Sequence, residues 1–369
     1  ESGYQDLVSR HLGTEHERVV VDSTQIGEVF PEVVWHGEHP ILRTAPAPLF
    51  LLSGLVRSAG YKVVVTGEGS DEVLAGYDIF RETIVRRYAA EHPDSADLDE
   101  LVVRLYPWME RSPTQVPAFA KAFFGQAADV NDPAISHRPR WRASGSLLRM
   151  LDPEFGAPPE GAAADELLSE LPERFWSWDP VERAQYLEMS TLLPGYILAP
   201  QGDRMLMGHS VEGRFPFLDH NVIEFASSLP VDQKLRNLDE KHILKHAFRD
   251  IVPVEVIDRP KQPYRAPDAA SFFSGDALPA WLDDLLDRDY VAAAGVFRPE
   301  VVEGVVRKAR SRDGLGMSNT DNMRIVALIS TMLLHTSFVS GRGAFERARR
   351  EADTVPFERI EPRGVYAGT

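Results

Sequence analysis

The sequence predicts an α/β fold built on a parallel sheet and followed by a largely helical C-terminal part. Helix-like and strand-like segments alternate from residue 7 to residue 66, which is the order typical of parallel sheets. Residues 62–66 (KVVVT) form a short β-branched run between turn residues, as buried parallel strands do. From about Asp165 onward the pattern is mostly helical, and it ends in residues 321–339.

The elements follow in chain order. Residues 7–12 are expected to end an amphipathic helix at Gly13, and residues 16–21 (HERVVV) to form a strand. Residues 26–35 are helix-like, with Pro31 breaking or restarting the helix. Three prolines make residues 40–48 extended or turn-like, and residues 49–60 have helical periodicity with a glycine stop.

This pattern divides the chain into three parts. Residues 1–106 form a core α/β region that is incomplete at its N-terminus, and residues 165–369 form a helical remainder. Between them, residues 107–164 hold many Pro, Ala and Gly residues and little periodicity, which predicts a loop-rich insertion.

Composition narrows the classes of function. The 369 residues include 40 basic and 56 acidic side chains, and this net charge of −16 argues against nucleic-acid binding. There is no cysteine, which excludes disulfides, thiolate metal sites and cysteine nucleophiles within this sequence. No run approaches the roughly 20 apolar residues of a membrane helix, and no signal peptide opens the chain. We therefore expect a cytoplasmic protein that binds no membrane.

The densest motif is residues 65–77 (VTGEGSDEVLAGY). Gly67 and Gly69 allow the backbone to approach a ligand, and the free N–H groups of a following helix favour phosphate. Glu68, Asp71 and Glu72 need Mg²⁺ or a proton-transfer role to be tolerated beside a polyphosphate. An acid-rich helix start that only satisfies the helix dipole explains the same spacing equally well.

Two further segments combine charge with apolar residues. Residues 201–220 (QGDRMLMGHSVEGRFPFLDH) suit a partly buried polar network, or a helix–turn segment with structural ion pairs. Residues 241–251 form an amphipathic helix that stops before Pro253, and a basic loop with Arg259, Lys261 and Arg265 follows. This loop suits a clamp for a triphosphate or pyrophosphate, or a solvated surface loop.

Taken together and in this order, the three segments resemble the synthetase domain of glutamine-hydrolysing asparagine synthetases. The matching residues are 66–77, 203–219 and 241–262, and residues 11–16 (HLGTEH) are also similar. The resemblance covers roughly residues 1–275. It implies an adenine-nucleotide α-hydrolase-like (PP-loop) domain in which residues 1–106 bind ATP.

The resemblance also implies a reaction with ATP and Mg²⁺. A carboxylic acid becomes an acyl-adenylate with release of pyrophosphate, and glutamine-derived ammonia displaces AMP to give the amide. Thr66, Gly67 and Gly69 would line the ATP site, and Glu68 would support adenylation and orient or deprotonate ammonia. Asp71 would lie near Mg²⁺ and pyrophosphate, Lys261 would neutralise phosphate charge, and Arg259 is a weaker candidate for that role.

Two parts of the family pattern are absent: the Ser-Gly-Gly-x-Asp-Ser phosphate loop and the N-terminal glutaminase domain with its cysteine nucleophile. We therefore expect these residues to belong to a longer polypeptide. A homodimer stays open as the oligomeric state.

The substrate prediction is aspartate, with a larger natural-product acid as the alternative. Aspartate-using relatives often carry Arg where Gln201 stands, and Gln201 cannot supply that charge. Two other readings compete with amide synthesis. One is a non-catalytic binding remnant, and the other is a β-lactam-forming cyclase, which needs a catalytic Tyr–Glu pair.

Overall fold

A computed structural model describes residues 2–92, 95–106, 132–259, 261, 264–275 and 278–340. The N-terminal part contains α1 (Ser2–Leu12), α2 (Ser23–Gly37), α3 (Pro46–Ser58), β1 (Val63–Val65), α4 (Ser70–Val73), α5 (Asp78–Glu91) and α6 (Asp97–Leu105). The middle part contains α8 (Arg138–Gly145), η3 (Ser146–Met150), η4 (Pro153–Phe155), α9 (Ala162–Ser169), η5 (Glu173–Ser177), α10 (Pro180–Ser190), the π-helix η6 (Leu193–Asp203), α11 (Arg204–Gly208), β2 (Glu212–Arg214), η7 (Pro216–Leu218) and α12 (His220–Ser228).

The C-terminal part is helical apart from one short hairpin. It contains α13 (Val231–Lys234), β3 (Leu235–Arg236), β4 (Asp239–Glu240), α14 (His242–Ala247), α15 (Val254–Ile257), α16 (Ala270–Phe273), α17 (Leu282–Leu285), α18 (Arg288–Ala294), α19 (Pro299–Arg310), α20 (Asn319–Leu334) and the π-helical η8 (His335–Val339). The chain is thus mostly helical with a small parallel sheet, as the sequence indicated in outline.

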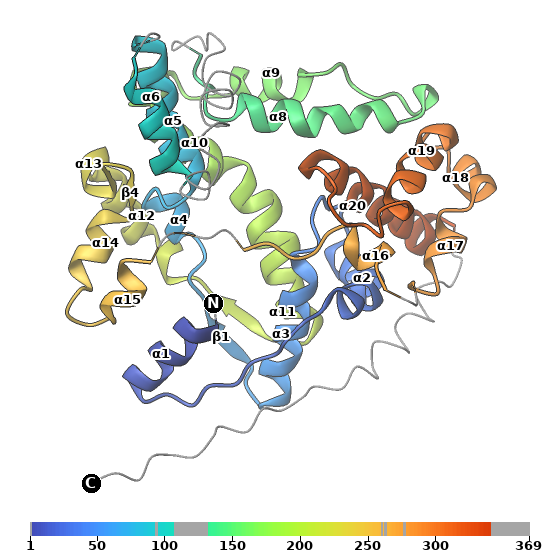
Figure 1. Ribbon diagram of the computed structural model, residues 1–369, viewed down its shortest axis with the longest axis horizontal. Coiled ribbons are helices and arrows are strands. Elements are labelled where there is room, and N and C mark those ends of the chain that lie inside the picture. The colour runs from blue at the N-terminus through green and yellow to red at the C-terminus, as the bar shows by residue number, and fades with distance from the viewer. Residues whose placement is uncertain are drawn as a thin grey trace.

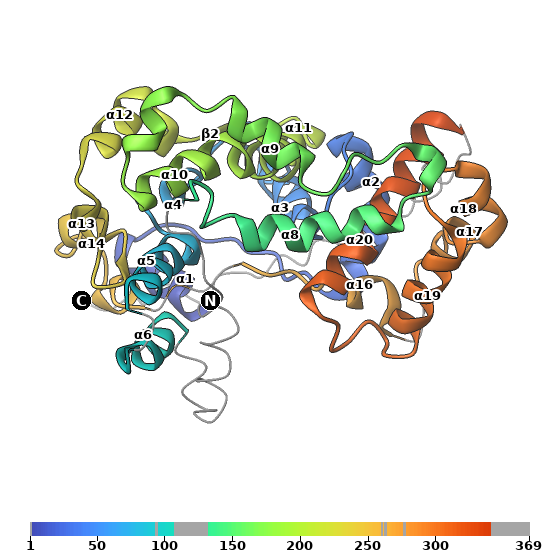
Figure 2. The ribbon, with the colours of Figure 1, turned by 90° about the horizontal axis from the view of Figure 1, so that it is seen from above.

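The parallel sheet joins β1 to β2, in the register Val63 opposite Glu212 and Val65 opposite Arg214. The largest apolar core lies beside it and unites α2, α3 and α11 with the C-terminal helices α16–α20. Figures 1 and 2 show α17–α20 at one end of the molecule and α12–α14 at the opposite end. The sheet and α3 lie between these two ends (Figure 1).

The predicted strand at residues 16–21 is wrong, because residues 14–22 form no strand in the structure. A strand needs a neighbouring backbone to take up its N–H and C=O groups. In the described part of the chain, β1 pairs only with β2, and no described strand pairs with residues 14–22.

Prolines explain two further differences. Pro31 does not break α2, which runs continuously from Ser23 to Gly37 with Pro31 buried inside it. Both halves of α2 bury apolar side chains in the main core, which offsets the missing hydrogen bond. Pro46 and Pro48, expected in an extended segment, lie in the first turn of α3, where the missing N–H of a proline costs little.

The remaining elements agree more closely. The N-terminal helix ends at Leu12 before Gly13, which has a φ of 66°. Residues 241–251 are helical only in α14, which is shorter than expected. The region 107–164 contains α8 in its described part, and its residues 107–131 lie outside the described residues.

Residues 319–339 form a helix long and apolar enough to span a membrane by length and composition. It is not a continuous run of roughly 20 apolar residues, because polar residues such as Arg324, Ser330 and His335 interrupt it. Half of its most apolar window is buried inside the protein, and Ile325, Leu328 and Ile329 belong to the main core. This burial is what a core helix shows.

Candidate active site

The first motif follows β1 at its carboxyl end. The Thr66 N–H donates to the Arg214 carbonyl at 2.9 Å, which continues the β1–β2 ladder into the loop. Gly69 has a φ of 89°, and a Cβ there would collide with the Leu218 side chain. The turn therefore requires glycine, and it aims the first turn of α4 back across the end of the sheet.

Asp71 lies at the centre of a charged cluster formed by two distant segments. Its Oδ1 lies 3.0 Å from Lys241 Nζ and 2.9 Å from Lys261 Nζ. Lys241 Nζ also donates to Ser70 Oγ at 2.9 Å. The three charged side chains are 18–24% exposed, so the cluster can still be reached by a ligand.

The cluster depends on close backbone approach. Gly76 lies against both Asp71 Oδ1 and Lys241 Cε, so a Cβ at this position would displace the pair. Lys241 itself has a left-handed backbone conformation, with φ 51°, where α14 begins. Burial lowers the pKa of Lys241, and Asp71 opposes that shift.

Glu68 and Glu72 have raised pKa values. Burial is the main cause for Glu68; nearby Asp71 adds to it, and Lys261 and Lys241 counter it. Burial raises the pKa of Glu72 to about 7, although Glu72 Oε1 accepts a hydrogen bond from the Tyr77 hydroxyl at 2.9 Å. Lys261 Nζ lies 5.5 Å from the centre of the Tyr77 ring, which adds a cation–π contact.

Helix α10 is hydrogen-bonded to the backbone of α4. The side-chain amide of Gln185 donates to the carbonyls of Glu72 and Val73, at 2.7 and 3.0 Å. One turn further along α10, the fully buried Glu188 accepts from Arg140 Nη1 at 2.6 Å. The position of Asp71 therefore rests on a buried polar layer that ligands do not reach.

A cavity of about 70 Å³ opens beside Thr66 and Glu68, between α3, the end of β1 and η6. Gln201 lines its wall. The Thr66 hydroxyl is buried and has no hydrogen-bond partner among the described residues. A buried hydroxyl without a partner fits a position where a ligand supplies the missing bond.

The predicted site residues fall into two groups. Thr66, Glu68, Asp71 and Lys261 converge at the end of β1, with Gly67 and Gly69 in the connecting turn. Arg259 lies instead over the Tyr4 ring of α1, at 5.3 Å.

The charged residues of the second motif are mostly exposed and do not form a buried network. Arg204 pairs with Glu38 at 2.8 Å, and Arg214 with Glu212 at 2.8 Å. Asp219 caps α12. The second motif contributes to the site β2 and five cavity residues: Gln201, Gly202, Met205, Leu206 and Phe215.

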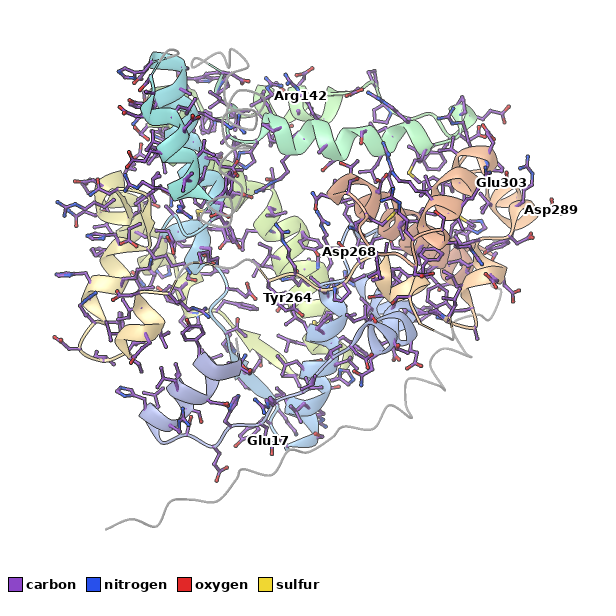
Figure 3. All side chains as sticks on the ribbon, viewed as in Figure 1. Glu17, Arg142, Tyr264, Asp268, Asp289 and Glu303 are labelled. Carbon is purple, nitrogen blue, oxygen red and sulfur yellow. The ribbon has the colours of Figure 1, made fainter. Side chains whose placement is uncertain are left out.

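Lys241 is the residue that sequence reasoning missed. The Lys-x-x-Leu-Lys pattern identified its segment, but only the fold shows that its ammonium group shares Asp71 with Lys261. Figure 3 shows Tyr264 and Asp268 on the segment of residues 264–269, which crosses the centre of the molecule toward α16.

The metal prediction rests on one carboxylate. In the described ranges, no group of three or more His, Cys, Asp or Glu side chains is placed to hold a metal ion. Asp71 alone offers one carboxylate, and two ammonium groups already contact it. These residues do not form a metal cage of their own.

Comparison with known proteins connects this geometry to a family. Residues 1–336 match the family described as asparagine synthase. The chain is 31% identical over 272 residues to a putative glutamine-hydrolysing asparagine synthetase of Mycobacterium bovis, covering 72% of this chain and 39% of that protein. It is 26% identical over 341 residues to the amidase chyE of Penicillium rubens, covering 87% of this chain and 49% of that protein. The chain thus spans about half the length, or less, of these relatives.

Proposed function

The chain belongs to the asparagine synthase family, and from this premise we propose that it is a carbon–nitrogen ligase. It activates a carboxylic acid with ATP and converts the acid into an amide. The observation that carries the proposal is the convergence of Lys241 and Lys261 on Asp71, beside the glycine turn at the end of β1.

In the first step, a carboxylate oxygen of the acid forms a bond to the α-phosphorus of ATP. The bond from that phosphorus to the bridging oxygen breaks, and pyrophosphate leaves with the electron pair. Lys241 and Lys261 release the Asp71 carboxylate and contact phosphate oxygens instead. Their positive charges then neutralise the leaving pyrophosphate. Preorganised cations of this kind act where charge develops, and removing one donor typically costs about 10²–10³-fold in rate.

In the second step, the nitrogen of ammonia forms a bond to the acyl carbon, and the carbon–oxygen bond to AMP breaks. The nitrogen loses one proton, and the Glu68 carboxylate accepts it. The raised pKa of Glu68 supports this role, because a base with a pKa nearer to neutrality is the better proton acceptor. Thr66 binds the adenylate through its unpartnered hydroxyl.

Mg²⁺ would enter with the nucleotide. Magnesium is commonly held by one or two carboxylates together with substrate phosphates. Asp71 would provide one such ligand once phosphate oxygens take over its lysines. The ion would then supply further charge neutralisation on the phosphates.

Glutamine-derived ammonia and a glutaminase domain outside this sequence complete the proposal. The mycobacterial relative is named as glutamine-hydrolysing, and it is much longer than this chain. The exposed side chains of Val63 and Val65, at 49% and 68%, support a further sheet element that covers β1. That element would carry the phosphate loop.

Aspartate and a natural-product acid are the two candidate substrates. Gln201 lines the cavity beside Glu68 and brings no positive charge, which favours the second candidate.

The test is pyrophosphate release by the full-length protein with Mg-ATP, ammonium chloride and a panel of carboxylic acids that includes aspartate. We expect acid-dependent release that Glu68→Ala abolishes. Glu303→Ala is the matched control, because Glu303 pairs with Arg288 on the distant α18–α19 surface (Figure 3). If no acid stimulated pyrophosphate release, the result would contradict the proposal and favour a non-catalytic binding domain. Replacing ammonium chloride by glutamine then tests the nitrogen source.

A further inference from the structure

The cavity beside Glu68 has an apolar wall. Its lining includes apolar side chains of α3 (Leu52 and Val56), of β1 (Val64), of α11 (Met205) and of Phe215. Met205 is completely buried and belongs to the main core, so packing fixes this part of the lining. A ligand group that enters the cavity is therefore surrounded by hydrocarbon.

Among the described residues, no positively charged side chain lines the cavity. Glu68 is the one ionisable side chain of this described lining. The Ser53 hydroxyl is already occupied, because it bonds to the carbonyls of Phe50 and Met205 and to His209 Nδ1. The polar groups left for a ligand are the Thr66 hydroxyl and the Gln201 amide.

A charged side chain is therefore a poor occupant. A second carboxylate placed here would lose its hydration without gaining a contact to a positively charged lining residue. An ammonium group would also lose its hydration, and Glu68 would be its one possible partner of opposite charge in the described lining. The lysines that contact Asp71 lie at the phosphate end of the site and do not line this cavity. Aspartate, with a carboxylate to spare after adenylation, does not match these surroundings.

The size of the cavity favours a small acyl group. A volume of about 70 Å³ is roughly half that of an apolar protein cavity of about 150 Å³ that binds benzene. A chain of a few carbon atoms fits this volume, whereas an aromatic ring or an adenine base would extend out of the cavity.

We propose that the cavity is the acyl pocket and that the acid is a short, uncharged aliphatic carboxylic acid of roughly three to five carbons. This inference rests on the proposed function. The hydrocarbon chain lies between α3 and η6, and the carboxyl group stays at the mouth beside Thr66 and Glu68. Each buried methylene should tighten binding by roughly fourfold until the cavity is full.

The experiment measures binding and needs no turnover. Calorimetry with the full-length protein compares acyl-sulfamoyl-adenosines, which are unreactive analogues of the acyl-adenylate, that carry acetyl, butyryl, benzoyl or aspartyl groups. We expect the butyryl analogue to bind at least about tenfold more tightly than the acetyl, benzoyl and aspartyl analogues.

Two variants localise the effect. Val56→Phe fills the cavity and should reduce the affinity for the butyryl analogue to that for the acetyl analogue. Gln201→Arg introduces the missing charge and should improve aspartyl binding about tenfold or more while weakening butyryl binding. Thermal unfolding checks that each variant is folded, and Gln201 is only partly buried, so this substitution is the safer of the two.

The outcomes separate the inference from the proposed function. Tighter binding of the aspartyl analogue to the wild type, or unchanged butyryl binding in Val56→Phe, would overturn the acyl pocket alone. Unchanged butyryl binding would instead indicate a path for ammonia. If neither ATP nor any analogue binds, the proposed function fails and the inference fails with it.

Discussion

Asp71 and Glu188 are two carboxylates that each lie within 3.8 Å of two nitrogen-bearing side chains, yet they differ in their access to solvent. Asp71 and its two lysines are 18–24% exposed. Glu188 is completely buried, with Arg140 Nη1 at 2.6 Å and His137 Nε2 at 3.8 Å. The Asp71 cluster is thus accessible to solvent, whereas Glu188 is not. Under the proposed function, ligand phosphate replaces Asp71 at the lysines, whereas Glu188 contributes only to stability.

Glu72 lies between these two regions and interacts with both carboxylates. Burial raises its pKa most strongly, and the charges of Asp71 and Glu188 raise it further. For Glu188, burial acts in the same direction, but His137 and Arg140 outweigh it and lower the pKa. Below pH 7, Glu72 therefore favours its protonated form, whereas Glu188 favours its charged form.

The largest effect is expected at the Asp71 cluster, where the two lysines are tested as phosphate ligands. Lys261→Ala and Lys241→Ala should each reduce pyrophosphate release by about 10²–10³-fold, because each removes a cation that faces the leaving group. The stability of both variants should change little. Lys308→Ala is the matched control, since it removes a lysine–aspartate pair with Asp321 far from the site. An equal loss of rate in the control would show that the effect is not local.

The second prediction addresses the buried region. Glu188→Ala should lower the free energy of unfolding by about 3 kcal/mol, since it leaves a cavity and removes the partner of Arg140. Urea unfolding measures this loss. Asp258→Ala should cost less than about 1 kcal/mol, because its pair with Arg249 is about half exposed. If both variants lost the same free energy of unfolding, burial of the pair would not determine its contribution to stability.

The third prediction uses the pKa of Glu72. A folded-state pKa of about 7, against an unfolded value of 4.5, means that the folded protein holds this proton more strongly. The stability that the proton contributes is complete below pH 4.5 and is lost as the pH rises through 7. Glu72→Gln should therefore stabilise the protein at pH 8.5, by on the order of 2–3 kcal/mol, and have little effect at pH 5.

The matched variant for this test is Glu188→Gln, whose effect should have the opposite sign. The pKa of Glu188 is lowered in the folded protein, so its charge stabilises the fold above pH 4.5. That contribution disappears as the pH falls through the folded-state pKa. Parallel pH profiles for the two variants would contradict the opposite protonation states.

Much of the site could be predicted from local pattern. The glycine turn after a β-branched strand placed Thr66, Glu68 and Asp71 at the end of β1, because that chemistry is encoded within a few residues. The basic loop alone indicates either a phosphate clamp or a surface loop, and it is the family resemblance that implies Lys261 as a phosphate ligand. The structure brings Lys261 to Asp71, and its phosphate role stays a prediction. The division of the chain into three parts stays a prediction.

What local pattern could not supply depends on distant contacts. Residues 16–21 have strand propensity, yet a strand forms only where a neighbour pairs with it. Pro31 remains helical because α2 is buried on both sides of it. Lys241 becomes a site residue only because Gly76 lets its side chain pass close to Asp71, and nothing in its own segment indicates this.

The smallest effect is expected from Ser70, and it separates the role of a hydrogen bond from that of the ion pairs in the Asp71 cluster. Lys241 Nζ donates to Ser70 Oγ at 2.9 Å, so Ser70→Ala removes one hydrogen bond and leaves both ion pairs to Asp71. A bond of this kind contributes about 1 kcal/mol, which predicts roughly fivefold weaker pyrophosphate binding. Calorimetry with magnesium pyrophosphate measures it. Ser58→Ala should leave affinity unchanged, because the Ser58 hydroxyl bonds within its own helix. If Ser70→Ala weakened binding as strongly as Lys241→Ala, the serine itself would contact phosphate, and the lysine would serve mainly to hold it in place.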